Sequence, residues 1–561
     1  MSQRDWLQLT VYFGALIVLT PILGGWMHRI FSNQSHVLRS LLGRVERAIY
    51  RLGGCNPEET MNWRQYATAL VLFNGVGFLV LFALQLGQHL LPFNPEHLPA
   101  VPPALALNTA MSFMTNTNWQ AYSGEATMSL LTQFAGLTVQ NFLSAASGLS
   151  VLVAMARGLV SRGSDSLGNF WTDLVRSTLY VLLPLSLVFA LVLVSQGVVQ
   201  TFSSSVEVTS LEGAKNSIPL GPVASQVAIK QLGTNGGGYF GANSAHPFEN
   251  PTPLSNFIEM LAILLLPAAT VDLYGRMVGS RRHGWALFSA MFVLLLATLA
   301  IGLYGEFQPN PAVGGLANLE GKETRFGIFN SVLWAGTTTA ASNGSVNAMH
   351  DSLTPLGGLM CLVNLVLGEV VFGGVGAGLY GLLLYVVLTV FIAGLMVGRT
   401  PEYLGKKIGK TEIIWVMIGT LVPFAFLLLF AAIAAVHPAG LASLGNAGPH
   451  GLSEILYAFA SMIGNNGSAF AGLNANTPFY NLLGTAALAI GRFAVLIPAL
   501  AIAGSLAPRK VSPPSAGTFP TDGILFVVLL VMVVVVVSGL THLPALTLGP
   551  IVEHVLLGRS F

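Results

Sequence analysis

Charge is what this chain has least of. Only 9% of its 561 residues are Asp, Glu, Lys or Arg, whereas 53% are hydrophobic. A soluble domain carries about a quarter charged residues, so this chain cannot cover a water-facing surface. Cysteine is scarce as well, and Cys55 and Cys361 stand far apart in unlike settings. This pattern excludes a disulfide framework and a cysteine metal site.

The sequence also lacks the machinery for using ATP. The stretch GKKIGKT at 405–411 has three residues between its glycines, where a phosphate-binding loop needs four. It is typical of a basic loop at a membrane surface. No DKTG-type phosphorylation motif and no large polar domain are present. His246 and His350 lack metal-ligand spacing and are expected to make hydrogen bonds. We expect no catalytic residues and no cofactor.

Long apolar runs predict an integral membrane protein of the all-α class. Runs of about twenty apolar residues, the length that spans a bilayer, recur along the chain. The predicted spans are 5–28, 65–88, 127–157, 175–199, 255–278, 285–304, 356–398, 412–436, 479–505 and 522–543. The run 356–398 is too long for one straight helix and is interrupted by FGGVGAG at 372–378.

Basic residues predict the orientation, because they gather in cytoplasmic loops. One set of loops holds 18 Lys and Arg residues and the other set holds 6. With ten spans, both termini are then expected outside the cell. The segment 36–52 has leucines at helical spacing with arginines on other faces. It could lie flat on the inner membrane surface or pack as an ordinary cytoplasmic helix.

A fourfold repeat organises most of the chain. Each of four outer connections has an apolar stretch too short to span, then a polar tail rich in Gly or Asn, then a new span. Such stretches suit re-entrant helices. We name the four tails the filter segments. Their aligned cores are Thr115-Asn116-Thr117, Thr234-Asn235-Gly236, Ser342-Asn343-Gly344 and Asn465-Asn466-Gly467. A Thr lies eleven residues after Asn116, Asn343 and Asn466, and Thr-Pro would start the following helix.

The repeat predicts a pore for a cation. Backbone that turns back inside a membrane is tolerated only within protein or along a watery cavity. If four such segments converge, their carbonyl oxygens can replace the hydration shell of a potassium ion. The negative C-terminal ends of four short helices would favour a cation there as well. The alternative, in which each Asn-Gly is merely a turn, does not explain four matching positions.

The phrases TNGGGYFGANSAHPFENPTP and SNGSVNAMHDSLTPLGG resemble the potassium-binding A subunits of the bacterial Kdp potassium-transporting ATPase. The likeness covers essentially the whole chain. It implies a single membrane domain of four fused helix–pore-loop–helix repeats in pseudo-fourfold arrangement, with one extra helix at each end. The expected units are 5–28, 65–160, 174–282, 285–400, 411–507 and 522–543. The resemblance also implies a bacterial inner-membrane location and three partners: a P-type ATPase B subunit, a single-span C subunit and a small F peptide. Membrane lipid is expected around the chain, and no nucleic acid.

The resemblance implies which residues contact the ion. By position, the metal site would comprise Asn116, Thr117, Asn235, Gly236, Asn343, Gly344, Asn466 and Gly467. The first segment has Thr117 where the others have glycine, and no segment reads TVGYG, the potassium-channel filter sequence.

Polar groups and glycines inside the spans predict an ion path below the filter. Charges within a membrane are costly, so Glu369 and Arg492 are expected either to line a cavity or to form a structural ion pair. Gly373, Gly374, Gly376 and Gly378 interrupt a span and are expected to form a gating loop, or else to allow close helix packing. Gln120 is a further candidate for the path.

These observations predict the ion-selective, non-hydrolytic subunit of an ATP-driven potassium importer. One alternative is a stand-alone potassium channel or ion-coupled transporter of the Trk/Ktr type. A second is an unrelated carrier whose polar loops bind an organic solute.

Overall fold

The computed structural model describes residues 1–561 except 312–313, 369, 397, 399, 514–518 and 558–561. Ten helical runs in this part of the chain are long and apolar enough to cross a membrane. They are α1 (Gln3–Phe31), α3 (Trp63–Gly87), η2 with α6 (Thr132–Thr138, Val139–Val160), α7 with η3 and α8 (Phe170–Arg176, Ser177–Leu182, Leu183–Ser195), α10 (Pro253–Met277), α11 (Arg281–Glu306), α14 (Ala377–Met396), α15 (Lys410–Val436), α18 (Pro478–Leu506), and α19 with η7 and α20 (Ile524–Leu546, Thr547–Ile551, Val552–Leu557). The predicted multi-pass, mainly helical class is confirmed.

Four shorter helices lie between the spans, and we call them the pore helices. They are α4 (Pro103–Met114), α9 (Val223–Leu232), α12 (Gly327–Ala340) and α17 (Gly448–Ile463). The remaining helical elements are α2 (Val37–Leu52), η1 (Gln88–Leu90), α5 (Gly124–Thr127), η4 (Asn243–Ala245), η6 (His350–Ser352), α13 (Pro355–Val366) and α16 (Pro438–Leu441).

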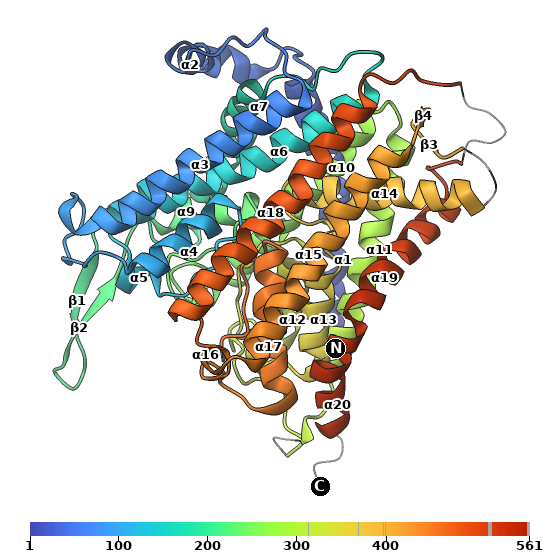
Figure 1. The fold of residues 1–561 in the computed structure, drawn as a ribbon. Helices are drawn as coiled ribbons and strands as arrows, with labels where there is room; N and C mark the ends of the chain where they lie inside the picture. Colours follow the sequence, from blue (N-terminus) through green and yellow to red (C-terminus); the bar gives the residue numbers. More distant parts are fainter. Residues whose placement is uncertain (312–313, 369, 397, 399, 514–518, 558–561) are drawn as a thin grey trace.

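The sequence did not predict the two small antiparallel hairpins. One pairs β1 (Ser205–Thr209) with β2 (Lys215–Pro219), and the other pairs β3 (Glu402–Tyr403) with β4 (Lys406–Lys407). The β1–β2 hairpin projects from the body of the molecule (Figure 1). Both are too short and polar to stand out from ordinary loops.

Thr-Pro starts the helices that follow three filter segments, as predicted. The hydroxyl of Thr252 accepts the Ser255 amide at 3.0 Å, and Thr477 likewise caps α18. Thr354 caps α13 in the same way. The first unit differs, because Thr127 ends α5 and Ser129 caps the helix after it, accepting the Thr132 amide at 3.2 Å. The proposed eleven-residue spacing therefore has no structural meaning in that unit.

The predicted run 356–398 is two helices. α13 ends at Val366, and α14 begins at Ala377 after the glycine-rich stretch. Because α13 has only 12 residues, it cannot cross a membrane alone.

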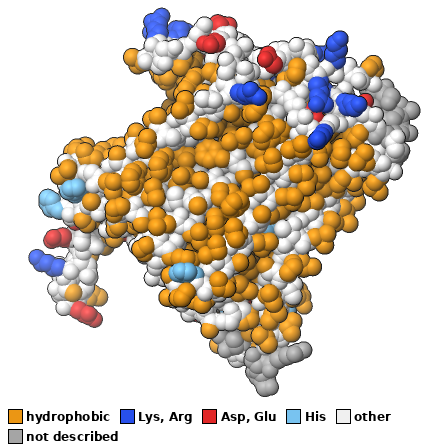
Figure 2. Space-filling view, in the orientation of Figure 1, with side chains coloured by type: hydrophobic (Ala, Val, Ile, Leu, Met, Phe, Trp, Pro, Cys, Tyr) orange, Lys and Arg blue, Asp and Glu red, His pale blue; other side chains and the backbone are white. Residues whose placement is uncertain are grey.

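Deeply buried helices lie at the centre of the molecule, and α1, α3 and α19 lie at its edge. α10 packs on α1, α15 on α18, and α11 on α13, so segments far apart in sequence share one core (Figure 1). Figure 2 shows a broad hydrophobic belt with most visible Lys and Arg side chains at one end, around α2 and the β3–β4 hairpin. We call this the basic end.

Helix α2 combines features of both predicted arrangements. Its buried Glu46 pairs with Arg176 at 3.1 Å and accepts a hydrogen bond from Tyr180. Val37, Leu41 and Leu52 on the same helix stay 67–90% exposed. One face of α2 is therefore packed on the protein, and a row of apolar side chains on the helix remains exposed.

The first prediction concerns the contact between α18 and the last pore helix. A methyl group on Gly491 would lie 2.0 Å from the carbonyl oxygen of Ile463, the last residue of α17. Gly491→Ala should therefore lower stability by about 1–3 kcal/mol through overpacking. The control is Gly539→Ala in α19, where an added methyl group meets no atom within 4 Å. Thermal unfolding of the purified protein checks this, and equal melting temperatures for the two variants would refute it.

Candidate functional site: a ring of four backbone segments

Each pore helix ends in the same backbone turn. The residue after each helix cap has a positive φ, and so does the residue two further on. The first of these are Asn116, Thr234, Ser342 and Asn465, with φ of 67°, 50°, 47° and 49°. The second are Asn118, Gly236, Gly344 and Gly467, with φ of 51°, 78°, 89° and 100°. Four copies of one local conformation establish the structural repeat.

This backbone pattern corrects the sequence register of the first filter segment by one residue. Thr117, not Asn116, occupies the position of Asn235, Asn343 and Asn466, and Asn118 occupies that of the glycines. Hydrogen bonds agree, because the amides of Thr117, Asn235, Asn343 and Asn466 each bond to the carbonyl five residues earlier, that of Ser112, Lys230, Thr338 and Ser461. The sequence aligned Asn116 with the other three asparagines, but asparagine, like glycine, tolerates positive φ, and here Asn118 takes the place of the glycine.

The asparagine side chains hold neighbouring units together. The Asn343 amide nitrogen donates to the carbonyl of Lys230 at 3.0 Å, and that of Asn466 donates to the carbonyl of Thr338 at 2.9 Å. Each thus bonds to the pore helix of the preceding unit. Their side-chain oxygens accept the backbone amides of Ser345 and Ser468 in their own segments. These side chains are occupied, which leaves the backbone carbonyls as the oxygens available to an ion.

The glycines let adjacent segments touch. A methyl group on Gly236 would lie 1.8 Å from the Asn343 oxygen, and one on Gly344 would lie 2.2 Å from the Asn466 oxygen. On Gly467 it would lie 2.1 Å from the Thr117 oxygen. Asn116 joins the first segment to the second through the carbonyls of residues 233 and 234. The four segments therefore form a closed ring.

Gln120 and Asn243 brace the second segment of this ring. The Gln120 side chain donates to the Gly238 carbonyl at 3.1 Å and accepts the Gly238 amide at 2.8 Å. Asn243 donates to the Gly236 carbonyl at 2.8 Å. Gln120 thus contacts the filter backbone rather than standing free. Neither Asn118 nor Asn243 was among the residues predicted from sequence.

The glycine-rich stretch between α13 and α14 lies against the ring. The amide of Val375 donates to the Thr234 hydroxyl at 2.9 Å, and the amide of Gly373 donates to the Ala340 carbonyl at 3.1 Å. Gly373 and Gly376 have positive φ, and a methyl group on Gly376 would lie 2.3 Å from the Gly148 oxygen.

The other two predicted glycines of this stretch differ from each other. Gly378 lies in α14, where a methyl group would strike the Phe372 oxygen at 1.7 Å. Gly374 has only ordinary contacts, at 3.5 Å, and no positive φ. Three of the four glycines are thus required by conformation or close approach, and Glu369 lies outside the described residues.

A small cavity adjoins the ring near Arg492. It holds about 40 Å³ and is lined by Gly464 and Asn465 of the fourth unit, by Arg492, and by residues of α14 and α15. Arg492 is 6% exposed, and its guanidinium lies 3.5 Å from the Ser144 carbonyl. Arg492 forms no ion pair with any carboxylate among the described residues. Arg492 therefore lines a cavity, and its place in the ion path stays a prediction.

The sequence did not predict two fully buried ion pairs, because their lysines resemble loop cations. Lys230 pairs with Glu249, and Lys322 pairs with Glu306 at 3.0 Å, with all four side chains 0% exposed. Burial of a lysine cannot be read from local composition, because its partner lies many residues away.

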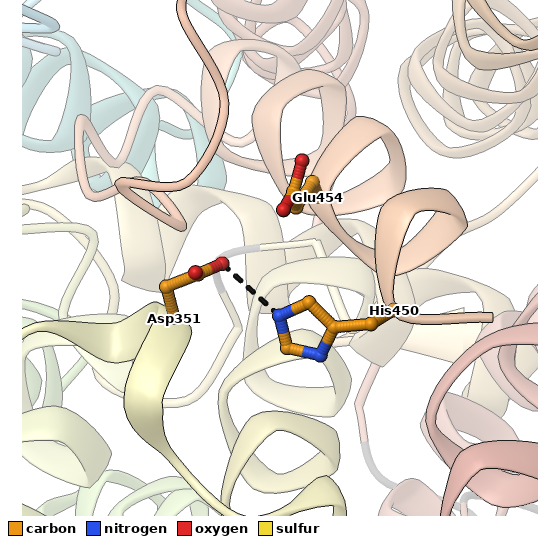
Figure 3. A group of neighbouring side chains, drawn as sticks. All are labelled: Asp351, His450 and Glu454. Carbon is orange, nitrogen blue, oxygen red and sulfur yellow. Dashed lines mark hydrogen bonds and ion pairs between the residues drawn. The ribbon is translucent and has the colours of Figure 1, made fainter. Parts of the chain in front are cut away.

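Three side chains in the described part of the chain could approach a metal ion. Asp351, His450 and Glu454 each offer a ligand atom within 4.8 Å of the others (Figure 3). However, both nitrogens of His450 are already hydrogen-bonded to carboxylates, Asp351 at 3.1 Å and Glu553 at 2.8 Å. The hydrogen bonds to Asp351 and Glu553 raise the pKa of His450 to about 10. A protonated His450 therefore links η6, α17 and α20, and it does not act as a metal ligand.

The family model described as "Potassium-transporting ATPase A subunit" matches residues 10–555. A relative from Mesorhizobium japonicum is 55% identical over the full length of both chains. Relatives from Leptospira interrogans and Methylorubrum extorquens are 55% and 56% identical, with at least 98% of each chain covered. All three are named potassium-transporting ATPase potassium-binding subunits.

A solved structure shares the fold. The potassium transporter TrkH from Vibrio parahaemolyticus aligns with a TM-score of 0.51, covering 78% of this chain and 85% of its own. Sequence identity is 12%, so this likeness concerns the fold alone.

The second prediction concerns the His450 link. Because its pKa is about 10 in the folded protein and about 6.5 when unfolded, its contribution to stability is complete below pH 6.5 and is lost as pH rises through 10. Solvent screens this partly exposed site, so we expect a loss on the order of 1 kcal/mol. Melting temperatures from pH 6 to 10 should fall less steeply for His450→Gln than for the parent. His89→Gln, at an exposed histidine, is the control. Parallel curves for His450→Gln and the parent would contradict the assignment.

Proposed function

Because the chain belongs to the family of potassium-transporting ATPase A subunits, we propose that it binds potassium ions from outside the cell and conducts them through the membrane. It is the transport subunit of an ATP-driven importer and not the hydrolytic subunit. The energy comes from a partner, since the sequence carries no phosphorylation motif.

The single observation that supports this function best is the closed ring of four backbone segments. Each segment directly follows the C-terminal end of a pore helix, whose partial negative charge favours a cation. The side chains of Asn343 and Asn466 are occupied by backbone groups, so carbonyl oxygens remain to replace the water around the ion. In our proposal the ion ligands are backbone oxygens of the eight predicted residues, with Asn118 added by the corrected register.

The proposed assembly and orientation follow from the family and from charge. The partners are a P-type ATPase B subunit, a single-span C subunit and a small F peptide, with lipid around the belt. The basic end faces the cytoplasm, because Lys and Arg favour that side. The location is a bacterial inner membrane, and both termini face outward.

The stretch between α13 and α14 is proposed as the gate. It is bonded to the ring through Thr234 and to the third pore helix through Ala340. It rests on α6 at Gly148, and Arg492 lies beside the adjoining cavity. An ion leaving the ring towards the basic end would meet this stretch and a positive charge, which together prevent free flow.

The third prediction tests the function itself. The parent complex, purified with its co-expressed partners, should take up K⁺ but not Na⁺ into proteoliposomes when ATP is supplied. In Gly344→Ala the methyl group would meet the Asn466 oxygen at a residue with φ of 89°, so uptake should fall on the order of 100-fold. Gly448→Ala also has a positive φ, 69°, but no atom lies within 4 Å of the added methyl group. It should transport nearly normally.

Three outcomes would overturn the proposal. Equal uptake of Na⁺ and K⁺ by the parent would show that the protein does not select potassium. Normal uptake by Gly344→Ala would show that the ion does not pass through the ring. Rapid K⁺ flux through the purified chain alone, without partner or ATP, would favour a stand-alone channel.

The fourth prediction concerns the gate. Gly376→Ala pushes the stretch away from Gly148, so vesicles loaded with K⁺ should leak without ATP. Gly374→Ala is the matched control, because its methyl group makes only ordinary contacts and should leave vesicles tight. Passive efflux is the measurement. If Gly376→Ala vesicles are as tight as the control while ATP-driven uptake declines, the stretch is structural and not a gate.

A further inference from the structure

One quadrant of the ring breaks the fourfold pattern. The carbonyl that accepts the filter amides belongs to Ser112 in the first unit, Thr338 in the third and Ser461 in the fourth. These are small hydroxyl residues. In the second unit the residue is Lys230, and its side chain is 0% exposed. A buried ammonium group directly behind an ion-binding ring opposes a cation unless it is neutralised, so its presence requires a reason.

Lys230 is neutralised and held by the loop that follows the second filter segment. Its ammonium group forms an ion pair with the buried carboxylate of Glu249. It also donates to the side-chain oxygen of Asn243 at 2.8 Å. The other oxygen of Glu249 accepts the amide of Phe240 at 2.9 Å. The pair therefore fixes residues 236–249 as a folded loop against the pore helix.

Asn243 transmits this constraint to the ring. With its oxygen on Lys230, its amide nitrogen is turned to the carbonyl of Gly236 and donates to it at 2.8 Å. Asn243 has a φ of 53°, a conformation sustained by surrounding contacts. No donor to the equivalent carbonyls of Asn118, Gly344 and Gly467 is found among the described residues, so the second quadrant is the one whose carbonyl is tethered.

A second buried carboxyl group lies close to Lys230. Glu259 of α10 accepts hydrogen bonds from Gln231 at 2.9 Å and from Ser244 at 3.2 Å. Gln231 in turn accepts the hydroxyl of Ser345 in the third filter segment at 3.0 Å. The groups behind the second segment are thus bonded to one another and to the next segment of the ring.

We propose that Lys230 and Glu249, acting through Asn243, hold the Gly236 carbonyl in one orientation and thereby set the potassium affinity and ion discrimination of the ring. This inference rests on the proposed function. Lys230 and Glu249 are positioning residues, since neither side chain lies in the ring itself. A carbonyl that can turn freely adapts to ions of different radius, whereas a tethered one does not, so the tether favours one ion size.

The chain offers a matched control for a purely structural role. Lys322 and Glu306 form the other fully buried lysine–glutamate pair among the described residues. Their contacts are with residues 352 and 354 at the start of α13 and not with a filter segment. Removal of either pair should affect folding similarly, but only removal of the first should affect the ion.

The test uses the complex purified with its partners and measures potassium-stimulated ATP hydrolysis. Asn243→Asp keeps the acceptor for Lys230 and replaces the donor to Gly236. It should raise the KM for K⁺ about tenfold, the effect of one lost hydrogen bond, and bring the KM for Rb⁺ and K⁺ closer together. The value of kcat should change about twofold or less, because ion binding and not chemistry is altered. The double variant Lys230→Met/Glu249→Gln, which removes both members of the ion pair together, should do the same.

The control double variant, Lys322→Met/Glu306→Gln, should alter melting temperature without altering KM or ion discrimination. Parent values of KM and of the Rb⁺/K⁺ ratio in folded Asn243→Asp would overturn the inference. If the double variant fails to assemble, Asn243→Asp alone decides. If the ATP hydrolysis rate of the parent complex does not depend on K⁺, the proposed function is overturned instead. Failure of this inference and failure of the proposed function are therefore distinguishable.

Discussion

The structure depends on one constraint: backbone that is not helical must find a partner for every polar group when it lies inside a membrane. The four filter segments meet this requirement with each other. Their amides bond to the last turns of the pore helices, and the side chains of Asn343 and Asn466 bond to the pore helices of neighbouring units. These bonds leave backbone carbonyls as the acceptors still open. These open carbonyls are where we propose that a dehydrated cation binds.

The same bonds explain why the ring forms only from all four units. No filter segment satisfies itself, because Asn466 needs Thr338 of the third unit and Asn343 needs Lys230 of the second. Glycine at 236, 344 and 467 removes the side chain that would separate adjacent segments. A single chain containing four units ensures that every neighbour is present. It also allows each quadrant to differ, as a ring of identical subunits could not.

The sequence predicted the class, the spans other than 356–398, and the approximate place of every filter segment, because these follow from hydropathy, short apolar helices and Asn-Gly turns. It misplaced the first segment by one residue, since Asn118 adopts the glycine conformation without being glycine. The same unit has no Thr-Pro, and Ser129 caps its following helix instead. The type of a residue indicates which backbone conformations it favours. Only the folded backbone shows which residue has adopted a given conformation.

Long-range pairing was beyond the sequence for a different reason. Lys230 looks like an outer-loop cation until the folded chain brings Glu249 and Asn243 to it. The contact between Thr234 and the amide of Val375 joins residues 141 positions apart in the sequence, and no periodic pattern predicts it. That contact joins a residue of the ring to the stretch proposed as the gate. The Thr234 hydroxyl therefore links the second quadrant directly to the proposed gate. The second quadrant is thus bonded to the stretch between α13 and α14 through Thr234, and the third quadrant is bonded to it through Ala340. In our proposal, the segments that select the ion are therefore in direct contact with the stretch that controls its release towards the basic end.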